Sequence, residues 1–122
     1  MIGIVMMGTS LALLLVGMFA GLVMGIRQDF LLVPAHAHLN LVGGVLMFLF
    51  GLYYRVIAAA ATDPLARWQA GLHIVGAILL PLGIAAVLIS GPGLTVLPVT
   101  GSFVVIAAVL LFAVIVLRHR NA

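Results

Sequence analysis

Four apolar segments divide the chain, and each is close to the ~20 residues that a helix needs to cross a bilayer. They cover residues 2–26, 34–57, 67–90 and 94–117. The breaks between them are short and rich in polar residues, Gly and Pro, which is typical of turns. Because short connections make sequential helices antiparallel neighbours, the pattern predicts an all-α membrane protein. We expect a single transmembrane domain, residues 1–122, folded as a four-transmembrane-helix bundle.

The composition excludes a water-soluble protein. Of the 122 residues, 66% are hydrophobic and 6% are charged, which is too few polar groups to cover a soluble surface. Five arginines and no lysine do not form the clustered positive charge of a nucleic-acid-binding protein. The absence of cysteine excludes thiolate metal sites and a c-type haem attachment. We expect membrane lipid, and not nucleic acid, to surround the chain.

The arginines predict how the bundle is oriented in the membrane. With four spans, one side carries most of them, and Arg27 alone lies on the other; those on the first side are Arg55, Arg67, Arg118 and Arg120. The positive-inside rule then places both termini in the cytoplasm. No basic residue precedes the first apolar run, so we interpret this run as a retained helix and not as a signal peptide. The sequence therefore predicts a multi-pass protein of the bacterial inner (cytoplasmic) membrane.

Two histidines, His36 and His38, lie at the start of the second apolar segment. Ionisable groups are rare in membrane spans and usually have a function there. Residues two apart on a helix point roughly 200° apart, so this pair cannot chelate one ion from a regular helix. Pro34 suits a first turn, which indicates that the helix has begun by His36. We predict two ligands on opposite faces of one helix; the alternative is two buried histidines satisfied by neighbouring backbone.

Other polar residues have more local interpretations. Asn40 follows His36 by one helical turn and is expected to hydrogen-bond that imidazole or a neighbouring helix. His73 is expected on the order of 15 Å in depth from the histidine pair, too far to share a metal atom with it. We predict that His73 is buried, neutral and bonded to a carbonyl. His119 lies in the polar C-terminal tail, and no role is assigned to it.

The first segment carries a stripe of small residues, Gly17, Gly21 and Gly25. Small residues four apart let another helix approach closely in a membrane. The spacing does not say which helix lies opposite. The stripe is therefore interpreted either as an oligomer contact or as packing within the subunit.

The stretch AHAHLNLVGGVLMFLFGLYYR, residues 35–55, resembles the tenth helix of the catalytic subunit (subunit I) of the heme-copper oxidase superfamily. The shared features are the His-x-His of His36 and His38, the pair Gly43-Gly44, Phe48 and Phe50, and the closing Gly-Leu-Tyr-Tyr of residues 51–54. In that family the first histidine binds the high-spin haem and the second binds the low-spin haem. By this resemblance, His36 and His38 are axial haem ligands that face two separate pores.

The chain also departs from the family pattern. Ala37 and Leu39 stand where the family has Phe and Tyr. The histidine trio that holds copper and the cross-linkable tyrosine motif have no match. The sequence contains no Glu, and neither Asp lies in a span, so an intramembrane carboxylate path for protons is missing. We therefore do not expect the chain alone to reduce oxygen or nitric oxide, and whether it is an enzyme stays open.

The family's catalytic subunit is built from three arcs of four helices, and this chain resembles one arc. The resemblance implies a homo-oligomer, a homotrimer, with three equivalent pores. Each pore would receive His36 from one subunit and His38 from the next and would hold a bis-histidine haem b. Arg27, the lone cation on its side, is the candidate to pair with a haem propionate.

The leading hypothesis is a small haem b-binding membrane protein that works in electron transfer or in haem-based redox or gas sensing. A redox partner protein or a quinone would exchange electrons with it. The first alternative is a membrane subunit that binds copper or zinc without redox turnover. The second is a non-catalytic helper of a respiratory complex.

Overall fold

The computed structural model describes residues 1–122 and is 88% helical. In chain order the elements are α1 (Ile2–Arg27), α2 (Val33–His38), the π-helix η1 (Leu39–Leu46), α3 (Met47–Val56), α4 (Ala58–Ala61), α5 (Pro64–Ser90), the 3₁₀-helix η2 (Pro92–Leu94) and α6 (Val96–Arg118). Elements α2, η1 and α3 form one continuous second span, Val33–Val56. Four helices are thus long and apolar enough to cross a membrane, so the chain has the build of a multi-pass membrane protein.

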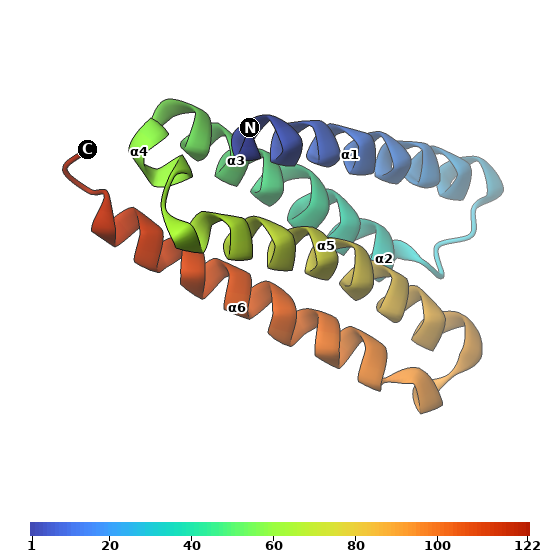
Figure 1. Ribbon diagram of the computed structural model, residues 1–122. Helices are drawn as coiled ribbons and strands as arrows, with labels where there is room; N and C mark the ends of the chain where they lie inside the picture. The colour runs from blue at the N-terminus through green and yellow to red at the C-terminus, as the bar shows by residue number, and fades with distance from the viewer.

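Neighbouring spans in the sequence are also neighbours in space. The first helix packs mainly on η1 and α3, the second span packs on α5, and α5 packs along α6. In Figure 1, α1 and α6 form the two edges of the bundle. Both termini and α4 lie at one end, which we call the termini end. The other end, where α1 connects to α2 and α5 connects to α6, we call the far end.

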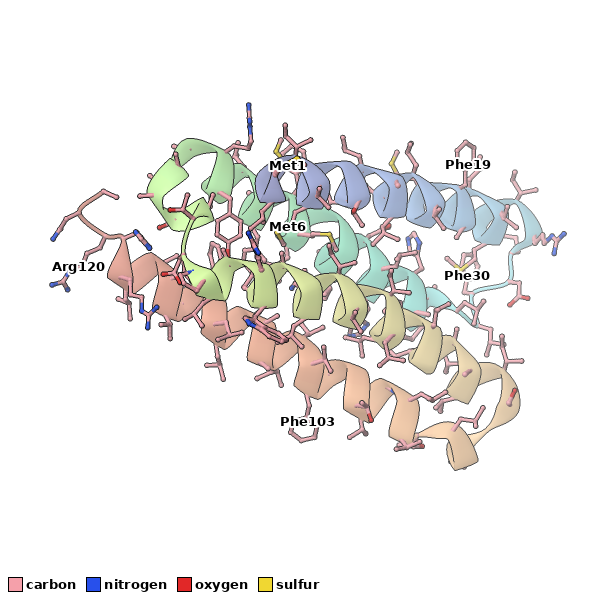
Figure 2. The ribbon with its side chains drawn as sticks, viewed as in Figure 1. Met1, Met6, Phe19, Phe30, Phe103 and Arg120 are labelled. Atoms are coloured by element: carbon pink, nitrogen blue, oxygen red, sulfur yellow. The ribbon has the colours of Figure 1, made fainter.

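Most of the molecular surface is apolar. Only 26 of the 122 residues are buried, so each helix presents much of its circumference to the surroundings. Phe19 and Phe103 are 66% and 70% exposed and point away from the bundle in Figure 2. Apolar surface of this extent is unsuited to water and fits lipid or another membrane subunit.

The start of α5 is set by a cap. Asp63 precedes the helix, and its Oδ1 accepts a hydrogen bond from the backbone N–H of Leu65 at 2.9 Å. Pro64 takes the first helical position, where its lack of an N–H has no consequence. The helix therefore begins at Pro64, three residues before the predicted start at Arg67, because the polar break itself supplies the N-cap and the first turn.

Glycines allow α5 and α6 to touch through their backbones. A Cβ atom on Gly83 would lie 2.6 Å from the backbone N of Pro98, and one on Gly101 would lie 2.8 Å from the backbone N of Leu80.

The apolar core lies nearer the termini end, where fully buried Met6 and Met47 meet Phe50, Tyr54 and Ile115. The bundle is thus tightly held at both places, whereas the histidine pair of α2 lies in a less buried region.

Candidate functional site

The histidine pair lies in a regular α-helix near the far end. Helix α2 begins at Val33 with Pro34 in its first turn, so the prediction that the helix has begun before His36 is confirmed. The two imidazoles diverge, as residues two apart on an α-helix must. His36 is half-buried against α1, and His38 is exposed on the outside of the bundle.

The ring of His38 is held in one tautomer. Its Nδ1 lies 2.7 Å from the carbonyl oxygen of Pro34. A carbonyl oxygen only accepts, so Nδ1 carries the hydrogen and donates it, and the lone pair is left on Nε2. Metal-ligating histidines characteristically donate the second ring N–H to a carbonyl or carboxylate, which fixes both tautomer and orientation. His38 therefore presents an unpaired Nε2 on an exposed, apolar helix face.

The ring of His36 is packed inside the subunit. A Cβ atom on Gly21 would lie 2.7 Å from its Cε1. The side-chain amide nitrogen of Asn40 lies 3.3 Å from its Nε2, so the predicted contact between Asn40 and His36 is present. With the amide donating, Nε2 is the acceptor, and Nδ1 is buried without a partner. Because Nε2 of His36 is bonded to Asn40, it is not available to a ligand in this arrangement.

The glycine stripe of α1 serves packing within the subunit at two of its three positions. A Cβ atom on Gly17 would overlap Oδ1 of Asn40, and Gly21 receives the ring of His36. Around Gly25 nothing lies within 4 Å of such an atom. Of the two interpretations of the stripe, packing within the subunit is therefore the correct one for Gly17 and Gly21.

Arg27 lies in the last turn of α1 at the far end and is exposed. It makes no ion pair, and neighbouring Asp29 accepts a hydrogen bond from the backbone N–H of Leu31 at 3.2 Å. Its guanidinium is thus free to bind an anionic group. The last turn of a helix is also where a cation is favoured by the helix dipole.

The span widens into the π-helix η1 directly after His38. This segment contains Asn40 and the Gly43-Gly44 pair, and it was not predicted from the sequence. Single π-turns inside α-helices are frequent at functional sites. The paired glycines, which are buried against leucines of α1, were the one available signal that the backbone here is unusual.

His73 of α5 is bonded to this π-helical segment. It is 0% exposed, and its Nε2 lies 3.0 Å from the carbonyl oxygen of Val42. The prediction of a buried histidine bonded to a carbonyl is confirmed. Val42 follows His38 by four residues, or about 6 Å of helical rise along the second span, and the separation in depth between His73 and the histidine pair stays a prediction.

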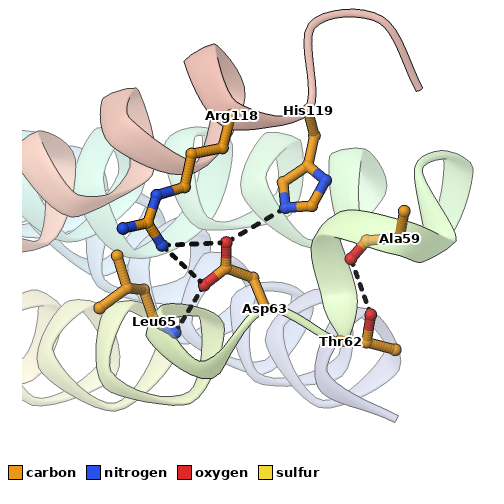
Figure 3. A network of polar contacts seen from close by, with 6 residues as sticks. All are labelled: Ala59, Thr62, Asp63, Leu65, Arg118 and His119. Carbon is orange, nitrogen blue, oxygen red and sulfur yellow. Dashed lines mark hydrogen bonds and ion pairs between the residues drawn. The ribbon is translucent and has the colours of Figure 1, made fainter.

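A polar network at the termini end joins the start of α5 to the end of α6 (Figure 3). Asp63 is buried, and its carboxylate lies 3.1 Å from Nε2 of His119 and 3.4 Å from the guanidinium of Arg118. The hydrogen bond from Leu65, helped by His119 and Arg118, holds the pKa of Asp63 below its ordinary value. His119, for which no role was predicted, therefore joins the end of α6 to the start of α5.

The arrangement of α2 fits a haem ligand at one of its two histidines. His38 has the fixed tautomer, free Nε2 and apolar surroundings that axial ligation needs. His36 fits only after its ring turns away from Gly21 and Asn40. Within one chain no group of three or more His, Cys, Asp or Glu side chains lies together.

No protein-family model, curated protein or solved structure matches the chain. The geometry of α2 and the resemblance in residues 35–55 therefore carry the functional hypothesis. The histidine on the exposed face, His38, is the strongest single element of it.

Proposed function

We propose that the chain is a haem b-binding protein of the bacterial inner membrane, with both termini cytoplasmic, related to one arc of the heme-copper oxidase catalytic subunit. One observation carries the proposal. The bond from Nδ1 of His38 to the Pro34 carbonyl at 2.7 Å leaves Nε2 as a free electron-pair donor on an exposed helix face. A histidine in hydrocarbon without a ligand would expose an unpaired polar atom, which the membrane disfavours.

A bis-histidine haem requires a second imidazole. Because His38 points out of its own subunit, the second ligand comes from another chain, and we propose a homotrimer in which it is His36 of the neighbouring subunit. For this, the ring of His36 leaves the surface of Gly21 and turns outward. Asn40, one turn along the same helix and already in contact with that ring, is the side chain that orients it.

The remaining residues hold and insulate the group. Arg27, which has no ion pair within the chain, binds a propionate at the far end. The apolar faces of the neighbouring helices exclude water from the ring. A haem with two histidine ligands supplies one-electron transfer and has no vacant position for a gas, so we favour electron transfer, with a quinone or a redox protein as partner, over gas sensing.

The proposal is tested by the absorption spectrum of the purified protein together with its metal content. We expect a Soret band and a resolved α band on reduction, one haem per chain, and a detergent-corrected mass of three chains. Colourless protein that contains copper or zinc would favour the metal-binding alternative. Protein with neither haem nor metal, after growth with excess haem precursor, would favour the helper role.

The His36→Ala variant tests the shared ligation separately. Loss of the six-coordinate spectrum, with the trimer retained, is expected if His36 of the neighbour is the second ligand. His119→Ala is the matched control, because it removes an imidazole at the termini end and is expected to leave the spectrum unchanged. An unchanged spectrum in His36→Ala would contradict the His36–His38 pairing and leave His38 alone as an assigned ligand.

A further inference from the structure

Two polar side chains with unmet hydrogen bonds lie in the middle of the bundle, apart from the histidine pair of α2. Gln69 and His73 are both 0% exposed, and both belong to α5, where residues four apart lie one above the other on the same face. Nε2 of Gln69 and Nδ1 of His73 have no hydrogen-bond partner. Buried polar atoms inside a membrane span are normally satisfied, because lipid supplies no alternative partner.

The other atoms of these two side chains are already bonded, and this fixes what the free atoms need. The hydroxyl of Tyr54 on α3 donates to Oε1 of Gln69 at 3.0 Å, so the free Nε2 of Gln69 is a donor. Nε2 of His73 lies 3.0 Å from the Val42 carbonyl, which can only accept. The hydrogen is therefore on Nε2, and Nδ1 of the neutral ring is an acceptor.

A donor and an acceptor thus lie one helical turn apart on the same face of α5. We propose that Gln69 and His73 bind a water molecule between them, which accepts a hydrogen bond from Gln69 and donates one to Nδ1 of His73. One water molecule satisfies both atoms, which is the usual role of buried water in proteins. The site is independent of haem and of His36 and His38.

The surroundings make this water site specific to His73. The ring of Phe50 from α3 meets the imidazole of His73 edge-on, with 4.9 Å between the ring centroids. Phe112 of α6 packs on Phe50, with 4.1 Å between their ring centroids. Asp63 and Arg118, at the termini end, are paired with each other. His73 is thus a fully buried imidazole inside a span, enclosed by aromatic rings on one side.

The experiment uses the full chain, labelled with ¹⁵N in histidine and glutamine side chains and reconstituted in lipid nanodiscs. We expect NMR to show His73 as the Nε2–H tautomer, with an Nδ1 shift typical of a hydrogen-bonded acceptor and with magnetisation transfer from water to the ring. Absence of water transfer, or a direct coupling between the Gln69 amide and Nδ1, would overturn the proposal in the wild-type protein without any variant.

Two variants separate the water site from general hydration. Gln69→Met, similar in size, should lose the water transfer and keep the Nε2–H tautomer, because the bond to Val42 remains. Tyr54→Phe removes the bond to Oε1 and leaves both free atoms in place, so the transfer should persist. Water transfer that survives in Gln69→Met, or that disappears equally in both variants, would contradict the assignment of the site to Gln69 and His73.

Discussion

At the scale of single residues, Asp63 both caps the start of α5 and joins it to the end of α6. It caps α5 through the backbone of Leu65 and binds both Arg118 and His119 from the other end of the sequence. The cap could be predicted from the sequence, because Asp before Pro is a typical helix start. The partners could not, because residues 55 and 56 positions away are brought beside it only by the packing of α5 on α6.

The pairing of Asp63 predicts an acid-sensitive bundle. Its pKa in the folded protein is below the ordinary value of 3.8, so its contribution to stability is present above that value and is lost as the pH falls through the folded pKa. Asp63→Asn keeps a capping oxygen and loses the charge. We expect its melting temperature to fall less than that of the wild type as the pH is lowered below about 4. Equal losses in both proteins would contradict this role.

Gly21 tests whether His36 must leave its pocket to bind haem. An added methyl group in Gly21→Ala would lie 2.7 Å from the ring and would expel it. If the outward ring is the ligand, removing the cost of that rotation should tighten haem binding by up to about tenfold. Gly25→Ala is the matched control, because nothing lies within 4 Å of its methyl group. Weaker haem binding in correctly folded Gly21→Ala, measured by haem titration, would argue against the outward ring.

At the scale of the elements, the second span was predicted in outline and not in its interior. Apolar length, Pro34 and helical geometry predicted the helix and its diverging histidines, because these depend only on local sequence. The π-helix η1 was not predicted, since an extra residue per turn depends on tertiary partners. One such partner is His73 of α5, which is hydrogen-bonded to the Val42 carbonyl of η1.

The contact between α5 and α6 predicts which glycines are indispensable. A methyl group in Gly83→Ala would meet the backbone of Pro98 at 2.6 Å, and backbone atoms cannot move aside as a side chain does. We expect a loss of roughly 2–3 kcal/mol in unfolding free energy. Gly71→Ala, in the same helix with nothing within 4 Å, should be neutral or slightly stabilising. Equal stability of the two variants in detergent unfolding would contradict the close backbone contact.

At the scale of the whole molecule, the bundle has two open edges and a largely apolar surface. The four spans and their order could be predicted because hydrophobic length and short connections decide them. The role of the glycine stripe could not, since spacing alone does not say whether the facing helix belongs to the same subunit. In the structure, side chains of the same subunit pack against Gly17 and Gly21, whereas His38 faces outward. This outward face is where we propose that a second copy completes the site.

The most direct test of haem ligation by His38 is electron paramagnetic resonance of the oxidised protein and its His38→Ala variant. We predict a low-spin ferric signal typical of two imidazole ligands in the wild type. In His38→Ala we predict that this signal is replaced by a high-spin one or is lost together with the haem. A low-spin signal that persists unchanged in His38→Ala would contradict the account.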